Sequence, residues 1–333
     1  MAGAPRAPAN YNQPDTRHMK PISIGKLRGL QQISSRRGTI TALALDHRQN
    51  LRKANPGFAH DGELSRFKLE VVSALAAEAT AVLLDPEVSA AQAIAHSVIP
   101  REVGLVVALE STGYTGEVIA RHAQIIPGWS VEKAKRMGAS AVKLLVYYHP
   151  HSSTAHEIES FVRQVAEDCA KHDLLLMLEP LSYSLDRNRK LTPEEKRFVV
   201  IETAKRLTSL NVDILKAEFP LDLAETDQNN WKEACEAVSS VSCVPWILLS
   251  AAANYETYLR QVTVACQAGA TGVAVGRAVW QEAISLTGRE RVSFLNNVAS
   301  QRLARLASLC AALARPFTEF YIAEAPFDWY KTY

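Results

Sequence analysis

Residues 211–220 read NVDILKAEFP, a short apolar run that is interrupted by two charged residues. Ile214 and Leu215 lead directly into Lys216, and Glu218 follows two residues later, on the same face of an extended chain. Unpaired buried charges are costly, so ionised residues are rare in protein cores. Taken alone, the stretch fits an ordinary strand whose lysine reaches water at the strand end. Its neighbours along the chain decide between that interpretation and a functional one.

Seven other runs of strand length occur along the chain, and they alternate with longer helical patterns. This order is typical of βαβ units and a parallel sheet. The eight runs are TITALALDHR (39–48), AVLLDPE (81–87), GLVVALE (104–110), AVKLLVYY (141–148), LLLMLEP (174–180), DILKAEFP (213–220), PWILLSA (245–251) and GVAVGRAVW (272–280). Eight strands with mostly helical returns predict an α/β fold, a single-domain (β/α)8 (TIM) barrel, rather than a doubly wound sheet.

The helical patterns between the runs carry recognisable start and stop signals. Ser130 and Thr192 are expected to be N-caps, the latter in the capping-box sequence TPEE. Gly138 and Gly269 follow the last turn of two helices, where glycine is favoured. The connection after the third strand, STGYTGEVIARHAQIIPG (111–128), gives no clean helix.

The chain shows no linker and no internal repeat that would indicate a second domain. We expect a flexible N-terminal tail over 1–25, the barrel over 26–315 with its last helix over 292–313, and an aromatic C-terminal tail over 316–333.

Composition excludes several classes of function. The chain is 47% hydrophobic and 22% charged, as in ordinary soluble globular proteins, and its net charge of +2 offers no bulk attraction for nucleic acid or an anionic membrane. No signal peptide and no run of eighteen apolar residues is present. The five cysteines lie far apart without zinc-ligand spacing. We therefore expect a cytoplasmic protein with reduced cysteines and no metal site.

Polar residues gather at the ends of the predicted strands. In a barrel, the active site is built where the C-terminal ends of the strands meet. The residues concerned are Asp46, His47, Arg48, Asp85, Glu87, Glu110, Glu179, Ser250 and Arg277, with Lys143 and Lys216 slightly deeper in the fourth and sixth strands. This clustering favours a functional role for Lys216.

The order Lys143, Glu179, Lys216 on three successive strands predicts Schiff-base chemistry. The pKa of a lysine, about 10.4 in water, falls when the ammonium is desolvated or lies near another cation, and the free amine then attacks a carbonyl. Lys143 would be the second cation, and Glu179 is the nearest candidate for proton transfer.

Simpler interpretations of these residues remain open at this stage. Lys143 could pair with Glu179 or Glu218 inside the barrel, and Glu218 could be a structural ion-pair partner rather than a catalytic group. His47 could serve only as a hydrogen-bonded neighbour of Asp46.

A metal site at Asp85 and Glu87 is disfavoured, because the DPE sequence does not supply an octahedral set of oxygen ligands.

The last two strands predict a phosphate site. Loops after strands seven and eight commonly bind phosphate in such barrels, with backbone N–H groups, a small hydroxyl or a guanidinium. The candidates are Ser250 with Ala251 and Ala252, and Gly276 with Arg277. Across the mouth, Arg48 could take a second anionic group.

With these residues identified, the chain resembles the class I tagatose-1,6-bisphosphate aldolase family, including relatives that cleave 6-deoxy-6-sulfofructose 1-phosphate. The similarity covers residues 39–288 and is carried by ALALDHRQNLRK, VLLDPEV, ALESTGY, WSVEKAKRMGASAVKLLVYYHP, LEPLSY, VDILKAEFP, ILLSAAAN and AGATGVAVGRAVWQEAI, in this order.

The resemblance implies a cofactor-independent, metal-independent retro-aldol cleavage of a sugar phosphate between C3 and C4, with dihydroxyacetone phosphate as one product. It matches the Schiff-base lysine to Lys216, the acid/base glutamate to Glu179 and the second lysine to Lys143. It also matches the first-strand aspartate to Asp46, and the phosphate-binding serine and arginine to Ser250 and Arg277, while His47 and Glu110 are further candidates for substrate contact.

Three departures from the family pattern concern the substrate rather than the reaction. His47 stands where the family usually has glutamine, and Ala252 stands where glycine is common. A long insertion between the fifth and sixth strands, which bisphosphate-cleaving members can carry, is absent. The group opposite the dihydroxyacetone phosphate end is therefore a phosphate, a sulfonate or a neutral hydroxyl.

Two other functions fit the same residue types. A barrel isomerase or epimerase would use Glu179 and Lys143 without a covalent adduct, and a non-catalytic phosphosugar-binding protein would keep only the fold. In each case we expect a homo-oligomer formed through outer helices and the aromatic tail.

Overall fold

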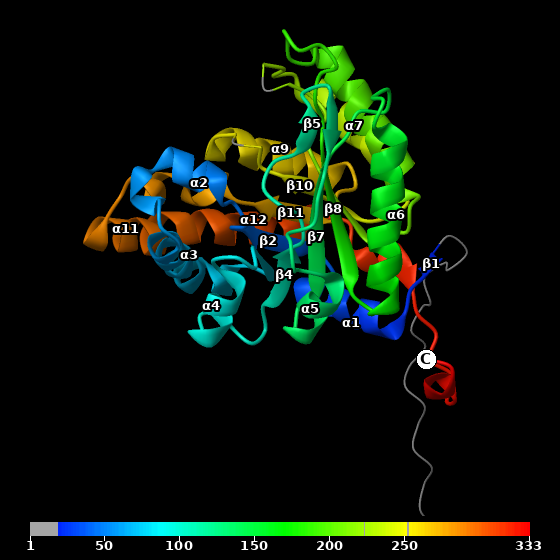
Figure 1. Cartoon of the computed structure of the whole chain (residues 1–333), viewed down its shortest axis with the longest axis horizontal. Coiled ribbons are helices and arrows are strands. Elements are labelled where there is room, and N and C mark those ends of the chain that lie inside the picture. Colours follow the sequence, from blue (N-terminus) through cyan, green and yellow to red (C-terminus); the bar gives the residue numbers. More distant parts are fainter. Residues whose placement is uncertain (1–18, 223, 252) are drawn as a thin grey trace, which may run out of the picture.

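The computed structural model describes residues 19–222, 224–251 and 253–333. Its centre is a closed barrel of eight parallel strands in the order β10-β11-β2-β3-β4-β7-β8-β9 (Figure 1). The strands are β2 (Ile40–Ala44), β3 (Ala81–Leu84), β4 (Gly104–Ala108), β7 (Ala141–Tyr147), β8 (Leu175–Leu181), β9 (Ile214–Ala217), β10 (Trp246–Leu249) and β11 (Gly272–Val275). The predicted (β/α)8 barrel is confirmed.

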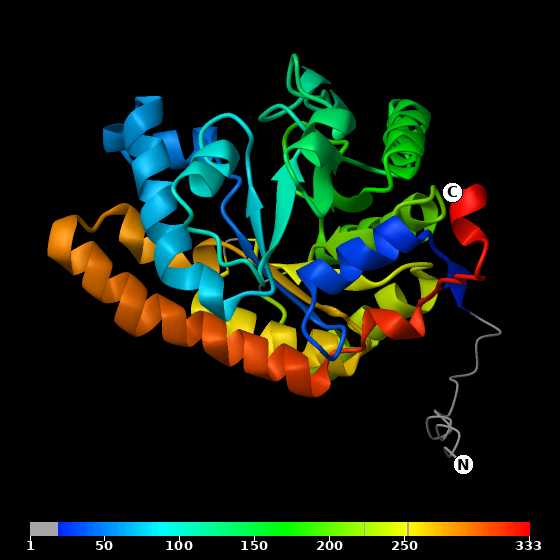
Figure 2. The same cartoon turned by 90° about the horizontal axis from the view of Figure 1, so that it is seen from below.

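Helices surround the barrel and cover its outer face (Figures 1 and 2). Because the strands pack on both faces, β2, β3, β4, β9, β10 and β11 are buried along their whole length. The helices are α1 (Ile24–Ile33), α2 (Gln49–Ala54), α3 (Asp61–Leu75), α4 (Ala90–Ala95), α5 (Val131–Arg136), α6 (Ala155–Lys171), α7 (Pro193–Thr208), α8 (Gln228–Val241), α9 (Tyr255–Gln267), α10 (Arg277–Trp280), α11 (Gly288–Phe294) and α12 (Ser300–Leu313).

The predicted helix ends are confirmed. Ser130 caps α5 by accepting from the N–H of Lys133, and Thr192 caps α7 in a complete capping box. Gly138 and Gly269 follow α5 and α9 with φ of 95° and 105°, a conformation in which glycine carries no steric penalty.

The connection after β4 contains no helix until α5. It forms a two-stranded antiparallel hairpin of β5 (Thr115–Glu117) and β6 (Ala120–His122). Arg121 holds the hairpin in place, because its guanidinium lies 4.3–5.0 Å from the ring centres of Tyr114, Tyr147 and Tyr183.

Two predicted boundaries need correction. The eighth run, expected as a strand over 272–280, ends as a strand at Val275, and Arg277 begins the short helix α10. The last helix is longer than 292–313, because α11 and α12 are joined by a π-helical segment, Leu295–Ala299, into one helical stretch.

The N-terminal end of the barrel is closed by chain segments from both ends of the sequence. β1 (Lys20–Pro21) pairs with β12 (Tyr321–Ile322), and the Tyr321 hydroxyl donates to the Asp213 carbonyl at 2.7 Å. Lys26 of α1 forms a buried ion pair with the Asp213 carboxylate at 2.8 Å. Figure 2 shows the C-terminal segment beside α1.

The three predicted regions of the chain stay a prediction. Residues 1–18 lie outside the described part, whereas residues 20–25 already hold β1 and the first turn of α1. No helix in the described residues combines the length and the apolar character needed to cross a membrane.

Candidate active site

A cavity of about 590 Å³ opens at the C-terminal end of the barrel. Asp85 and Glu87, also expected at the strand ends, are not among the described residues that line it. The residues predicted to act in catalysis or substrate binding do line it: Asp46, His47, Arg48, Glu110, Lys143, Glu179, Lys216, Ser250, Gly276 and Arg277. They come from the ends of β2, β4, β7, β8, β9, β10 and β11, which a closed parallel barrel brings to one mouth.

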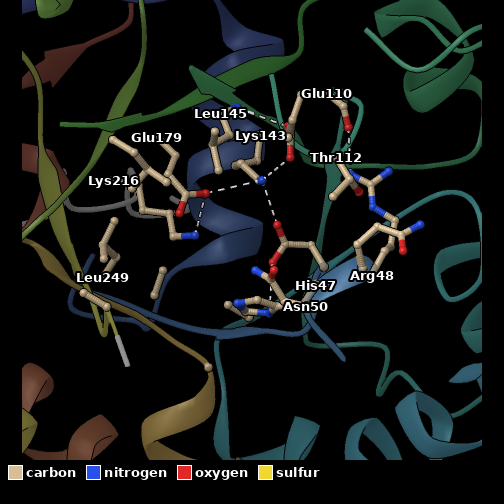
Figure 3. Close-up of a pocket in the computed structure, with 18 of the residues that line it drawn as sticks. His47, Arg48, Asn50, Glu110, Thr112, Lys143, Leu145, Glu179, Lys216 and Leu249 are labelled. Atoms are coloured by element: carbon tan, nitrogen blue, oxygen red, sulfur yellow. Dashed lines mark hydrogen bonds and ion pairs between the residues drawn. The ribbon is translucent and has the colours of Figure 1, made fainter. Parts of the chain in front are cut away.

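Lys143 lies at the centre of the cavity floor and is almost completely buried (Figure 3). Its ammonium contacts three carboxylates: Asp46 at 2.7 Å, Glu179 at 3.3 Å, and Glu110 through a short hydrogen bond. The other oxygen of Glu110 accepts from the Leu145 N–H at 3.1 Å. Pairing of Lys143 with Glu179 is therefore confirmed, but Glu218 is not among its partners.

Lys216 projects from β9 toward Glu179 of the neighbouring strand β8 (Figure 3). Its Nζ lies 2.8 Å from Glu179 Oε2, the same oxygen that faces Lys143. One carboxylate oxygen thus contacts the Nζ atoms of both lysines. Both lysines and Glu179 are buried, so water screens these charges little.

Charge and burial shift the pKa values of this cluster in different directions. Burial alone would lower the pKa of Lys143, but the carboxylates of Asp46, Glu110 and Glu179 outweigh it and hold that pKa well above its usual value. Burial alone would raise the pKa of Asp46, but Lys143 and Lys216 hold it well below its usual value. For Glu110 burial prevails and its pKa is raised. Lys143 and Asp46 are therefore a fixed ion pair at neutral pH.

His47 is a neutral neighbour of this cluster. Burial lowers its pKa to about 4, against the opposing effect of Asp46, whose carboxylate lies 4.0 Å from Nδ1. The imidazole packs edge-on against Trp280, with ring centres 5.9 Å apart. Nδ1 has no hydrogen-bond partner in the described part of the chain. The expected hydrogen bond to Asp46 is thus not formed at normal length.

The predicted phosphate end is assembled by β10 and β11. The Gly276 N–H points to the Ser250 hydroxyl at 3.4 Å, and Ala251 next to it has a positive φ of 39°. Arg277 lines the cavity, and burial lowers its pKa. Within the described residues Arg277 makes no ion pair. Ala252, the third backbone group expected here, lies outside the described residues.

Arg48 is held by protein groups rather than being free in the mouth. Its guanidinium pairs with Glu87 and donates to the Glu110 carbonyl at 2.8 Å. Asp85 forms a fully buried ion pair with Lys68 and accepts from Ser89 at 2.6 Å. Asp85 and Glu87 therefore have structural partners.

Several residues of the cavity wall were not predicted from the sequence. They include Asn50 and Lys53 on α2, Thr112 and Tyr114 before β5, and Tyr147 at the end of β7. Lys53 is exposed and has no ion-pair partner in the described part. Asn50 and Lys53 come shortly after the DHR sequence of the first strand. This proximity in sequence to predicted site residues is the feature that points to them.

Comparisons with known proteins agree with this architecture. The model of the DeoC/LacD family aldolases matches residues 40–282. Tagatose 1,6-diphosphate aldolase 2 of Enterococcus faecalis is 30% identical over 84% of this chain and 95% of its own length. Tagatose 1,6-diphosphate aldolase of Listeria monocytogenes (serotype 4a strain) is 29% identical over 82% of this chain and 86% of its own.

Solved structures share the fold at lower identity. An archaeal fructose 1,6-bisphosphate aldolase superposes with a TM-score of 0.59 at 23% identity, over 86% of this chain and 99% of its own. Fructose-bisphosphate aldolase from Plasmodium falciparum gives a TM-score of 0.66 at 13% identity, over 89% of this chain and 98% of its own. The barrel, the extent of the family match and the similarity to named aldolases together show that this chain belongs to the DeoC/LacD family of aldolases, which are lyases.

Proposed function

We propose that this protein is a class I aldolase that cleaves a ketose 1-phosphate through a Schiff base on Lys216. The observation that carries the proposal is the contact of 2.8 Å between Lys216 Nζ and Glu179 Oε2 in a buried cavity. A lysine ammonium next to a carboxylate has an acceptor for the proton that it must lose to become the nucleophilic amine.

The proposed reaction uses the groups around Lys216 in turn. The amine attacks C2 of the ketose, and the carbinolamine loses water to give an iminium ion, with Glu179 transferring the protons. A base then removes the C4 hydroxyl proton, the C4 oxygen forms the carbonyl of the departing aldehyde, and the C3–C4 bond breaks. The electron pair of that bond passes to C3 and into the iminium ion, which becomes an enamine on Lys216. Protonation at C3 and hydrolysis release dihydroxyacetone phosphate and restore the amine.

Lys143 and Asp46 supply the electrostatic frame for these steps. Lys143 stays an ammonium because three carboxylates surround it. It can therefore stabilise the negative charge that develops on the C4 oxygen of the substrate without itself losing a proton. Asp46 stays a carboxylate because Lys143 and Lys216 hold its pKa well below the usual value. Glu110 also holds the Lys143 ammonium in place, through a short hydrogen bond.

We assign the substrate phosphate to Ser250, Gly276 and Arg277, which converge at the end of β10 and β11. A guanidinium without a protein ion pair is suited to a phosphate. At the other end, Arg48 already binds Glu87 and Glu110, which leaves the exposed Lys53 as the cation for a second anionic group. A bisphosphate such as tagatose 1,6-bisphosphate, or 6-deoxy-6-sulfofructose 1-phosphate, meets both requirements.

Borohydride trapping tests the Schiff base directly. The protein is incubated with dihydroxyacetone phosphate, reduced with borohydride and weighed by mass spectrometry, and we expect one covalent adduct located on Lys216. Lys216→Ala should remove the adduct, whereas Lys196→Ala should keep it, because Lys196 lines a separate cavity. Absence of the adduct from the native protein, or its survival in Lys216→Ala, would disprove the proposal.

The identity of the sugar is tested with ketose 1-phosphates that carry phosphate, sulfonate or hydroxyl at C6, by measuring the release of dihydroxyacetone phosphate. We also propose that the protein is cytoplasmic and forms a homo-oligomer. Light scattering would measure the mass of the assembly.

A further inference from the structure

Glu218 follows Lys216 by two residues, yet it has no part in the chemistry described above. It is half-buried, lines the active-site cavity and forms no ion pair with the described residues. The structural ion pair considered from the sequence is therefore not found. Its carboxylate instead accepts a hydrogen bond of 2.6 Å from the backbone N–H of Ser182.

This hydrogen bond lies where the backbone pairing between β8 and β9 is incomplete; we call this pair of strands the β8–β9 seam. β7 and β8 pair along seven positions, from Ala141–Leu175 to Tyr147–Leu181. In contrast, β8 and β9 pair at only two positions, which end at Leu178–Leu215. Beyond that pair, no backbone ladder joins the two strands.

The two proposed Schiff-base residues lie just beyond the last ladder pair. Glu179 follows Leu178 on β8, and Lys216 follows Leu215 on β9, so their contact of 2.8 Å spans the unpaired part of the seam. The far end of this unpaired part is bridged by Glu218, which directly follows β9, and by Ser182, which directly follows β8. A side chain here takes the N–H that a longer ladder would pair with a backbone carbonyl.

We propose that Glu218 is a positioning residue, whose hydrogen bond to Ser182 closes the β8–β9 seam and holds Glu179 in contact with Lys216. The inference rests on the proposed Schiff-base function of Lys216. To accept from the Ser182 N–H, residue 218 needs an acceptor oxygen on a side chain of the correct length, but it does not need a negative charge. Burial raises the pKa of the Glu218 carboxyl, which agrees with a role that does not depend on its ionisation.

Two substitutions separate reach from charge. Glu218→Gln keeps the length and an acceptor oxygen but loses the charge, whereas Glu218→Asp keeps the charge but is one methylene too short. We expect Gln to retain kcat within about twofold, and Asp to lower kcat about 10- to 100-fold, because a displacement of about 1 Å between reacting groups can cost 10²-fold. KM should change little in both variants, since Glu218 is not assigned to the phosphate.

A second readout does not depend on catalysis. Hydrogen exchange at the Ser182 amide should be slow in the native protein and in Glu218→Gln, and faster in Glu218→Asp and Glu218→Ala. The rate of borohydride-trapped adduct formation should fall in the same two variants.

Three results would overturn the inference. If Glu218→Asp kept activity and Glu218→Gln lost it, the negative charge would be what matters. If all variants behaved like the native protein, the hydrogen bond to Ser182 would have no role in positioning. Unchanged exchange at Ser182 in Glu218→Asp would show that the seam does not need Glu218. Because the exchange measurement needs no substrate, it remains decisive even if the native protein forms no Schiff base.

Discussion

Among the single residues, Lys143 compensates the charge of more buried carboxylates than any other cation of the site. Its ammonium is the shared partner of Asp46, Glu110 and Glu179, all of them largely excluded from water. Removing one member of a buried ionic cluster is costly because the remaining charges lose their compensation. The residue therefore links the stability of the barrel to the proposed chemistry.

Replacement of this lysine should be destabilising as well as inactivating. We expect Lys143→Met to lower the free energy of unfolding by about 3–5 kcal/mol at pH 7, and to abolish measurable cleavage. Urea unfolding and an aldol-cleavage assay measure the two effects. As a control, Lys232→Met removes an exposed ion pair with Glu236 and should change stability by less than about 0.5 kcal/mol. Equal losses in the two variants would contradict this account.

The cost of Lys143→Met should depend on pH, and the sign follows from the shifted pKa values. The raised pKa of Lys143 makes its contribution complete below the normal lysine range and lost only far above it. The lowered pKa of Asp46 makes its contribution complete above the normal aspartate range and lost as pH falls through the folded value. The difference in stability between native and mutant protein should therefore shrink below about pH 4, where carboxylates take up protons. A constant difference from pH 7 to pH 3 would exclude the ionic explanation.

His47 should not set the pH dependence of the reaction. Its pKa of about 4 keeps the imidazole neutral through the neutral range. We expect His47→Gln, the residue that the resembled family usually has, to retain kcat/KM within about threefold and to leave the profile unchanged from pH 5.5 to 9. Loss of a limb near pH 6 to 7 in this variant would show that His47 titrates during the reaction.

At the scale of elements, the barrel closes only because backbones approach closely at one seam. Gly272 begins β11 with a φ of 144°, and a Cβ placed there would lie 1.8 Å from the carbonyl oxygen of Ile40 on β2. Both strands are fixed by their other neighbours in the ring, so neither can move away freely. Glycine at this position is therefore a requirement of closure.

Substitution at this seam should be far more harmful than at an open loop glycine. We expect Gly272→Ala to cost at least about 3 kcal/mol, from steric overlap and an unfavourable backbone conformation, and to lower the yield of folded protein. Gly128→Ala is the matched control, because its φ is also positive, but apart from its chain neighbours no atom of the described residues lies within 4 Å of the added Cβ. A cost of about 1 kcal/mol is therefore expected. Circular dichroism during thermal unfolding compares the two; similar losses would refute the role of the close approach.

The elements also show why the sequence pattern located strands better than their ends. The alternation of apolar runs and helical patterns places every barrel strand, because both signals are local. Val275 ends β11 although the predicted strand continues to Trp280, since Arg277–Trp280 forms a helix that packs Trp280 edge-on against His47. Apolar runs do not distinguish a buried strand from a short buried helix, so only packing decided that boundary.

At the scale of the whole molecule, the two ends of the chain stabilise the barrel opposite the active site. β12 pairs with β1, Phe317 and Tyr321 are buried, and the Tyr321 hydroxyl binds the Asp213 carbonyl. Burial of two aromatic side chains contributes about 3–6 kcal/mol. The aromatic C-terminal tail, which the sequence suggested as part of an oligomer interface, contributes these two buried side chains to the core of the chain itself.

Truncation should separate stability from activity. Removal of residues 316–333 is expected to lower Tm by at least about 5 °C while kcat at 20 °C stays within about twofold, because the deleted contacts lie at the N-terminal ends of the strands. Removal of 324–333 alone keeps β12 and should have a smaller effect on Tm. A truncated protein with native Tm, or one that is folded at 20 °C but has lost its activity, would contradict this assignment.

Local sequence patterns are enough to predict the barrel, the strands that carry polar residues at their ends and most of the charged residues that line the mouth. These follow from local periodicity and from the rule that parallel strands present their C-terminal ends together. The partners of these charges, in contrast, are known only from the folded geometry: Lys143 contacts three carboxylates, Arg48 pairs with Glu87, and Glu218 accepts from a backbone N–H. Side chains one strand apart can pair in several ways, and the choice depends on register and burial, which sequence spacing does not encode.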